Sequence, residues 1–455
     1  MTQEINPVMT NPVDSSVKLD NASRRNFIKG SSLLVAGGTM IGSLPIARAA
    51  HAFGSDAIKL GLIGCGGRGS GAAVQAMNTK GGEVRITAMA DIFENRMVQA
   101  TRSILKDHPD KYDVKDGTRF IGIDAYKKLL DTNVDIVVLA TPPGFRPVHF
   151  EAAIDAGKHV FAEKPVASDA PGVRRFLKAN EKAKEKNLAV AVGLQRHHEV
   201  AYVQTMEQLK NGAIGDIVFC RCYWNSTGVW TRNREEKESE LEYQMKNWYY
   251  FTWLSGDHIV EQHIHNIDVI NWLMDGHPVK ANGMGGRQVR TGKEHGHIYD
   301  HHAVEYTYAN GVTMLSQCRH MNDCWGQVSE FAHGTKGWCD ISGGKIYDRD
   351  NKLTWSTKGK RDGHQEEHHD LFAMLREGKI PNEGQYGADS TMTAIMGRMA
   401  TYSGKTLTWD QVFNSELELA NFAGFKSFDD PAPVQPLADG SYEILQPGSN
   451  LKKIL

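Results

Sequence analysis

Residues 58–69 carry the sequence IKLGLIGCGGRG, in which an apolar run leads directly into glycines with G-x-G-x-x-G spacing. The run 58–63 is typical of a buried strand, and residues 70–77 are typical of the first turns of a helix. Gly64 permits a tight turn, Gly66 lets the backbone approach a pyrophosphate, and Gly69 lets helix and strand pack closely. Strand, glycine turn and helix in this order are the context of a dinucleotide-binding loop.

An acidic residue follows at the distance that ribose recognition requires. Asp91 ends the next apolar run, 86–90, and lies 22 positions after Gly69. A carboxylate there accepts hydrogen bonds from the adenosine ribose and disfavours a ribose phosphate, which favours NAD over NADP. Arg96 is close enough in sequence to leave NADP open. The alternative is a flavodoxin-like domain with a coincidental glycine turn.

The first half of the chain alternates short apolar runs with helical patterns, which predicts a doubly wound parallel sheet of the Rossmann type. The predicted strands are 59–63, 84–89, 136–140, 159–162 and 189–192. Ligands of such sheets bind beyond the carboxyl ends of the strands. The residues expected to contact the cofactor are Gly64, Cys65, Gly66, Gly67, Arg68, Gly69, Asp91, Arg96, Thr141, Pro142, Glu163 and Lys164.

The second half has a different periodicity. Runs such as 217–224, 303–308 and 312–319 alternate like antiparallel strands, and Asn310-Gly311 between two of them predicts a hairpin. Two helical stretches, 260–274 and 389–402, are expected on one face of a mostly antiparallel sheet. The predicted organisation is a cofactor-binding domain over 56–193, a substrate-binding and oligomerisation α+β domain over 194–425, and a C-terminal surface segment over 426–455.

The first 52 residues are expected to be an export signal and linker. Residues 23–29 read SRRNFIK, a twin-arginine pattern, and lead into a weakly apolar stretch and the small-x-small cleavage pattern at 47–49. Twin-arginine export suits a protein that binds its nucleotide before leaving the cytoplasm. We therefore expect a periplasmic or other extracytoplasmic protein without stable membrane insertion after cleavage. An uncleaved anchor is the alternative.

Composition excludes several classes of function. The net charge of −2 and the lack of a long basic run argue against nucleic-acid binding. The six cysteines include no C-x-x-C spacing, which argues against a disulfide framework or a zinc site, although one disulfide stays open.

Four ionisable residues in the second half of the chain have the spacing of one helical face. If residues 257–274 form one helix, then His258, Glu261, His265 and Asp268 are spaced by three, four and three positions and share a face. A charged stripe is most often a solvated face, but this one contains only histidines and acids. Histidine paired with a carboxylate is a standard arrangement for proton transfer.

Together these motifs resemble the glucose-fructose oxidoreductase / inositol dehydrogenase / rhizopine catabolism (Gfo/Idh/MocA) family over residues 58 to about 414. The resemblance implies a nicotinamide cofactor and the oxidation or reduction of sugar or polyol hydroxyls. The matching segments are 64–69, Asp91, Glu163-Lys164-Pro165, Gly193, the stretch from Gly256 to Asp268, and 406–410.

The resemblance also implies residue roles. Lys164 matches the lysine that binds the reacting oxygen, and His265 matches the imidazole that acts as general base. Family members usually place Asp four residues before that histidine, whereas this chain has Glu261. Whether Glu261 contacts substrate or only orients His265 stays open. Asp268 completes the predicted catalytic set. The pattern around the histidine of the family's glycosidase branch is absent.

Four residues are candidates for substrate binding: Gln195, Arg196, Trp253 and His258. Gln195 and Arg196 follow the last strand of the parallel sheet and could hold sugar hydroxyls, or could form a salt bridge between domains. The aromatic group 248–253 could stack on a sugar ring, although core packing is the plainer role for at least half of it. Histidines 295, 297, 301 and 302 invite a metal interpretation, but their alternating spacing and the needs of hydride transfer predict no bound metal.

The leading functional hypothesis is an exported NAD(P)-dependent oxidoreductase that acts on a sugar or glycoside with a tightly held cofactor. The alternatives are a glycosidase that works by transient oxidation and elimination, and a non-catalytic sugar sensor. The family resemblance further implies a homodimer or homotetramer formed through the sheet face.

Overall fold

The computed structural model describes residues 57–360, 362–448 and 454. These residues belong to one compact unit. The expected export signal lies outside the described residues. Among the described helices, none is both long and apolar enough to cross a membrane.

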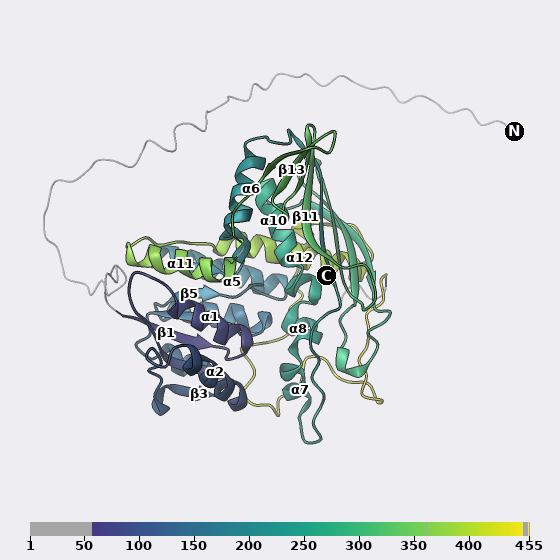
Figure 1. Ribbon diagram of the computed structural model, residues 1–455. Coiled ribbons are helices and arrows are strands. Elements are labelled where there is room, and N and C mark those ends of the chain that lie inside the picture. Colours follow the sequence, from purple (N-terminus) through teal and green to yellow (C-terminus); the bar gives the residue numbers. More distant parts are fainter. Residues whose placement is uncertain (1–56, 361, 449–453, 455) are drawn as a thin grey trace, which may run out of the picture. The chain divides into compact units, whose positions relative to one another are not determined.

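The first half forms a six-stranded sheet in the order β3-β2-β1-β4-β5-β6 with every neighbouring pair parallel (Figure 1). The doubly wound prediction is therefore confirmed. The strands are β1 Ile58–Ile63, β2 Val84–Asp91, β3 Arg119–Ile121, β4 Ile136–Leu139, β5 His159–Ala162 and β6 Val190–Val192. The helices are α1 Gly67–Met77, α2 Glu94–Asp107, α3 Ala125–Leu130, α4 Arg146–Asp155 and α5 Ala170–Glu185. Because the strand order reverses beside β1, the carboxyl ends of β1, β4 and β5 open toward one crevice.

The second half is built on a nine-stranded sheet in the order β14-β13-β12-β11-β7-β10-β9-β8-β15. The pair β7–β10 is parallel and the remaining pairs are antiparallel, as the sequence predicted. Gly311, with φ of 85°, makes the predicted turn between β9 and β10. The strands are β7 Ile217–Ser226, β8 Lys280–Gly286, β9 His301–Thr307, β10 Thr313–His320, β11 Gln327–Gly334, β12 Gly337–Asp340, β13 Lys345–Asp348, β14 Leu353–Ser356 and β15 Leu407–Thr408.

Helices α10 and α12 pack on one face of this sheet (Figure 1). Burial alternates along β10, so that Met314 and Cys318 face the helices while Leu315 and Gln317 lie on the opposite, half-exposed face. The helices of this half are α6 Val200–Lys210, α7 Glu240–Lys246, α8 Thr252–Ser255, α9 His258–Glu261, α10 Ile264–Met274, α11 Gly363–Arg376, α12 Gly384–Ser403 and α13 Trp409–Phe413. All six cysteines are free.

Two sequence predictions need correction. The single helix expected over 257–274 is divided into α9 and α10, with a break at Gln262 and His263, so the four ionisable residues do not share one helical face. The other correction concerns α11, which was not predicted. Its side chains Leu371, Phe372 and Leu375 join the core formed by β1 and α1. A segment of the predicted substrate domain therefore completes the cofactor-binding half.

The C-terminal segment, residues 415–448, contains no helix or strand and packs across the first half. Phe422 lies 5.1 Å from Phe145, and Phe428 stacks on Phe93 at 5.5 Å between ring centroids. Phe93 follows the end of β2 by two residues, so this segment passes beside the position of Asp91.

Candidate active site

The glycine loop between β1 and α1 accepts only glycine at two positions. Gly64 has φ of 96°, and a Cβ there would lie 2.6 Å from the carbonyl carbon of Ala140. A Cβ on Gly69 would lie 2.0 Å from the Gly64 oxygen. Gly66, at the N-cap of α1, supplies no side-chain cap, and a Cβ on Gly66 or Gly67 would meet nothing within 4 Å. An uncapped helix N-terminus facing open space fits the pyrophosphate of a dinucleotide.

Asp91 is fixed at the end of β2 by the loop itself. Its carboxylate accepts hydrogen bonds from the backbone N–H groups of Cys65, at 2.6 Å, and Phe93, at 2.8 Å. Burial raises the pKa of this carboxyl above its usual value. Arg96, on α2, lies near enough to interact electrostatically with Asp91. The predicted ribose acceptor and the predicted loop are thus in direct contact.

A buried arginine joins the loops after β4 and β5. The Arg146 guanidinium donates hydrogen bonds to the carbonyl oxygens of Thr141 and Pro165. The Thr141 hydroxyl is 3.1 Å from Nδ1 of His149. Burial lowers the pKa of Arg146 to about 10, so the side chain stays charged at neutral pH. Sequence reasoning missed Arg146 because no motif marks it, whereas it named Thr141 and Pro142 beside it.

Glu163 and Arg68, both predicted cofactor contacts, bind each other. Arg68 Nε lies 2.7 Å from Glu163 Oε1, and the Glu163 side chain is almost fully buried. A Cβ on Gly193 would lie 2.7 Å from Glu163 Oε2, so the end of β6 packs tightly on this carboxylate. The ion pair therefore ties the glycine loop to the residue that precedes Lys164.

Lys164 reaches across to the second half of the molecule. Its Nζ donates hydrogen bonds to the backbone oxygen of Glu261, at 2.6 Å, and to Glu261 Oε1, at 3.0 Å. The two side chains are 13% and 14% exposed, so the pair is sheltered but accessible. An ammonium group has three hydrogens, and this arrangement leaves one for a further acceptor. Glu261 therefore orients Lys164, a partner that the sequence did not identify.

His265 lies in the first turn of α10 with its ring 6.0 Å from that of Trp224. Its side chain is buried, and Nδ1 has no hydrogen-bond partner among the described residues. Burial and the nearby positive charge of Lys164 lower the pKa of His265 well below its usual range. A neutral imidazole carries a lone pair on one nitrogen, which is the state that a general base needs before the reaction. Its assignment as general base stays a prediction.

Asp268, the fourth predicted catalytic residue, is occupied by other partners. One carboxylate oxygen lies 2.9 Å from His197 Nε2, and the other accepts a hydrogen bond of 2.8 Å from Ser390. The His197 ring is stacked between Trp272 and Tyr386, at 4.3 and 4.4 Å. Asp268 therefore holds His197 in place.

The structure gives different environments to the four residues predicted to bind substrate. Arg196 forms a buried ion pair with Glu330 of β11, so it takes part in a salt bridge, as in the alternative interpretation, but one that joins the segment after β6 to the second sheet. Trp253 donates to Gln244 at 2.8 Å and is 1% exposed, so it is a core residue rather than a sugar platform. His258, the first residue of α9, is fully buried. Gln195 retains a buried side-chain oxygen with no hydrogen-bond partner in the described chain.

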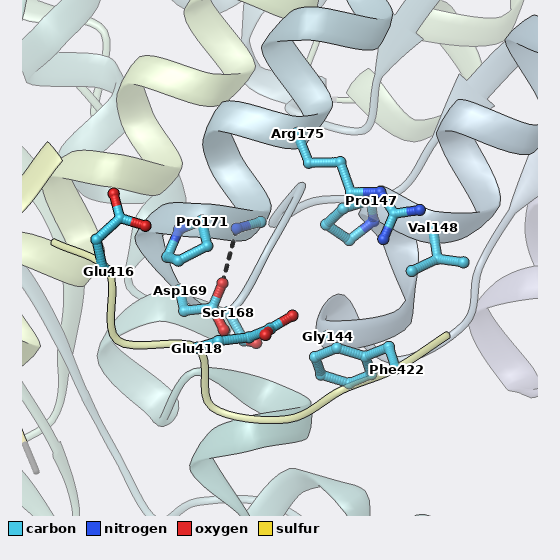
Figure 2. A pocket seen from close by; sticks show the side chains of 11 residues that line it. Gly144, Pro147, Val148, Ser168, Asp169, Pro171, Arg175, Glu416, Glu418 and Phe422 are labelled. Atoms are coloured by element: carbon cyan, nitrogen blue, oxygen red, sulfur yellow. Dashed lines mark hydrogen bonds between the residues drawn. The ribbon is translucent and has the colours of Figure 1, made fainter. Parts of the chain in front are cut away.

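A cavity of about 270 Å³ lies elsewhere, at the N-terminus of α5 (Figure 2). Asp169 caps α5 by accepting from Gly172 N at 2.8 Å, and its other oxygen accepts from Leu419 N at 2.9 Å. Arg175 and Phe422 also line this cavity. It forms where the C-terminal segment crosses α5, and neither Lys164 nor His265 lines it.

Comparison with known proteins identifies the class. Residues 58–194 match the family model described as oxidoreductase family, NAD-binding Rossmann fold, and residues 202–340 match the GFO/IDH/MocA C-terminal domain. The chain belongs to the GFO/IDH/MocA family. Its first half is accordingly an NAD-binding domain, as the glycine loop and Asp91 predicted.

Among curated relatives, an inositol 2-dehydrogenase of Acidothermus cellulolyticus is 27% identical over 231 residues, 51% of this chain and 58% of the relative. An inositol 2-dehydrogenase/D-chiro-inositol 3-dehydrogenase of Halalkalibacterium halodurans is 29% identical over 218 residues, 48% of this chain and 53% of the relative. The chain thus spans about half the length of the curated relatives it matches.

Solved structures share the fold. The scyllo-inositol dehydrogenase of Lactobacillus casei with bound NAD(H) and scyllo-inositol has a TM-score of 0.59 at 18% identity, covering 78% of this chain and all of that one. The aldose-aldose oxidoreductase of Caulobacter crescentus has a TM-score of 0.60 at 17% identity, covering 77% of this chain and 99% of that one.

Proposed function

We propose that the protein is an exported NAD(P)-dependent oxidoreductase that moves hydride between a hydroxyl-bearing carbon of a sugar, polyol or glycoside and a tightly held nicotinamide cofactor. One observation carries the proposal: Glu261 holds the Lys164 ammonium, which follows β5, near enough to the buried His265 ring for its charge to lower the pKa of that imidazole. This pairing sets a hydrogen-bond donor and a proton acceptor beside the crevice of an NAD-binding domain. The inositol dehydrogenases among its relatives are consistent with a polyhydroxylated substrate.

Each side chain of the site has its own role in the proposed reaction. The free hydrogen of the Lys164 ammonium binds the reacting oxygen of the substrate, and His265 accepts the hydroxyl proton. Glu261 keeps the ammonium in position, and Arg146 fixes the loops that end β4 and β5. Uncapped N–H groups of α1 and the Asp91 carboxylate would hold the dinucleotide, whose nicotinamide supplies the hydride acceptor or donor.

Retention of the cofactor and export are parts of the same proposal. NADH is not readily recycled outside the cytoplasm, so an exported enzyme benefits from a cofactor that stays bound and is reset by a second substrate. The C-terminal segment, which stacks Phe428 on Phe93 near Asp91, supports retention. The twin-arginine pattern at residues 23–29 supports export.

The sheet face opposite α10 and α12 supports self-association. Met284 is 79% exposed there, and Leu315 and Phe331 on the same face are half-buried. A homodimer or homotetramer would cover these apolar side chains. Light scattering on the purified protein tests this part, and a monomer at micromolar concentration would contradict it.

The function is tested by denaturing purified protein and identifying any released nucleotide by mass and absorbance. Monosaccharides, inositols and glycosides are then added to the native protein while nicotinamide absorbance is followed. Reduction of bound cofactor by one substrate and reoxidation by another supports the proposal. Release of an aglycone without any acceptor would favour the glycosidase, and ligand binding with an inert cofactor would favour the sensor.

A further inference from the structure

A second cluster of ionisable side chains lies at the opposite end of α9 from Glu261. Asp257 and His258 come from the turn that starts α9, and His302 comes from β9. All three are buried, and one ligand-type atom from each lies within 4.8 Å of the others. His302 Nε2 is 3.4 Å and His258 Nε2 is 3.9 Å from Asp257 Oδ1. We propose that these three residues bind a divalent transition-metal ion of the Zn²⁺ class.

The first argument is that the cluster contains unpartnered nitrogens. Among the described residues, neither ring nitrogen of His258 has a hydrogen-bond partner, and His302 Nε2 has no contact closer than the Asp257 carboxylate at 3.4 Å. A fully buried imidazole without partners is costly, because its polar atoms have lost water and gained nothing in exchange. The neighbouring His320 provides a contrast, since its Nε2 lies 2.7 Å from Gln262 Oε1 and its Nδ1 lies 3.3 Å from Arg290.

The second argument concerns the tautomer of His302. Its Nδ1 lies 2.9 Å from the Thr401 hydroxyl, and that hydroxyl donates its only hydrogen to the Arg398 carbonyl at 2.9 Å. When the hydroxyl donates to that carbonyl, it accepts from His302 Nδ1–H. In the neutral ring this leaves a lone pair on Nε2 that faces the Asp257 carboxylate. In that tautomer two acceptor atoms lie 3.4 Å apart, and a bound cation would satisfy both.

The geometry also suits a metal. Bonds of about 2.0–2.1 Å in a tetrahedral zinc site set neighbouring ligand atoms about 3.4 Å apart, close to the two measured distances. The other Asp257 oxygen accepts from Tyr402 OH at 2.7 Å and Tyr299 N at 3.1 Å, and Thr401 orients His302. Such outer partners are what metal ligands usually have. Asp257 is further held at φ of 78° and ψ of 161°, a conformation that is rare for residues other than glycine.

The site would have a structural consequence. A bound ion would join β9 to the turn before α9, and α9 ends at Glu261, the partner of Lys164. Two imidazoles and one carboxylate leave a coordination position for water, and imidazole and carboxylate ligands suit Zn²⁺, Fe²⁺ and Co²⁺. The sequence did not point to this cluster, because Asp257 and His302 are 45 positions apart.

The test uses untagged protein stripped with a chelator and then titrated with Co²⁺, whose visible absorption reports inner-sphere ligands. We expect saturation at one equivalent per chain, displacement by Zn²⁺, and a higher melting temperature with Zn²⁺ that a chelator reverses. His258→Gln and His302→Gln should each weaken Co²⁺ binding at least tenfold. His108→Gln, which removes a histidine on the surface of the first half, should bind normally.

Wild-type protein that shows no saturable Co²⁺ absorption would overturn the proposal and leave a protonated His302 paired with Asp257. Unchanged affinity in both folded histidine variants would also overturn it. Near-ultraviolet circular dichroism establishes whether the variants are folded. If neither variant folds, Asp257→Asn and the wild-type titration decide the question. None of these readouts depends on enzymatic activity.

Discussion

Two ion pairs join segments that lie far apart in the sequence, and they differ in which hydrogen-bonding groups each leaves free. Arg196 and Glu330 are 10% and 0% exposed, and the Glu330 carboxylate also accepts from Tyr202 OH, at 3.0 Å, and from Asn266. Lys164 and Glu261 are 13% and 14% exposed, and one ammonium hydrogen has no assigned acceptor in the pair. The first pair is buried, and the Glu330 carboxylate has its hydrogen-bond donors, so its role is structural. The second is accessible and incomplete, so it can serve chemistry.

The largest effect is expected from Lys164→Met. Loss of the donor to the reacting oxygen should lower kcat/KM by roughly 10²–10⁴-fold, while the melting temperature and the nucleotide content stay close to wild type. Lys182→Met, at an exposed pair on α5, is the matched control. Steady-state kinetics and thermal melting provide the measurements. A variant with nearly full activity would remove Lys164 from the mechanism.

Glu330→Ala should act on stability instead. Removal of the carboxylate leaves the Arg196 guanidinium buried and unpaired, which costs about 3–5 kcal/mol of unfolding free energy. Urea unfolding followed by circular dichroism measures this loss, with Glu305→Ala, an exposed carboxylate on β9, as the control. If both variants unfold at the same urea concentration, the buried pair contributes no more than a surface charge.

A smaller effect is expected from Glu261→Gln. The amide oxygen can still accept from the Lys164 ammonium, but the negative charge of the carboxylate is lost and the hydrogen bond weakens, so kcat should fall about ten- to hundredfold with little change in KM. Glu261→Asp keeps the charge and shortens the reach, so its kcat should be higher than that of the glutamine variant. The reverse order would show that length, rather than charge, positions Lys164.

The smallest effect per residue is the loss of stability at acidic pH, and it is expected in both halves of the molecule. Burial lowers the pKa of His149 and His263 to about 3 and that of His297 to about 4. As pH falls below about 6.5, the unfolded chain binds protons that the folded chain does not, so stability falls. Each such histidine removes about 1.4 kcal/mol per pH unit until its folded pKa is reached.

Urea unfolding between about pH 7 and pH 5 measures that slope, and His263→Gln should reduce it by one histidine's share. A stability that is flat or rises toward pH 5 would contradict the neutral state assigned to these rings. Because His149 lies in the first half and His263 in the second, the slope is expected for the whole unit.

Much of the first half was predictable because its signals are local. Five of the six parallel strands follow from apolar runs, and the missed strand β3 has only three residues, none of them buried. Gly64 and Gly69 were recognisable because no other residue fits their positions. The hairpin at Asn310-Gly311 was recognisable for the same reason, since its turn requires a positive φ.

The candidate site was only partly predictable. The sequence marked Lys164, Glu261 and His265, but it assumed one continuous helix. Gly256 and Asp257 both have positive φ before α9, and the chain breaks again before α10, so helical periodicity misplaced His258. Trp253 was misassigned because an aromatic residue has the same sequence signature in a core as in a binding cleft.

The sequence by itself determined the parallel sheet, the dinucleotide loop and the ribose acceptor, because backbone sterics and the burial of apolar runs act over a few residues. The tertiary structure alone decided that Lys164 meets Glu261 across 97 positions and that His302 faces Asp257 and His258. Those contacts depend on strand order, register and helix packing, which no local pattern encodes. Burial then fixed the charge states of the groups that were brought together.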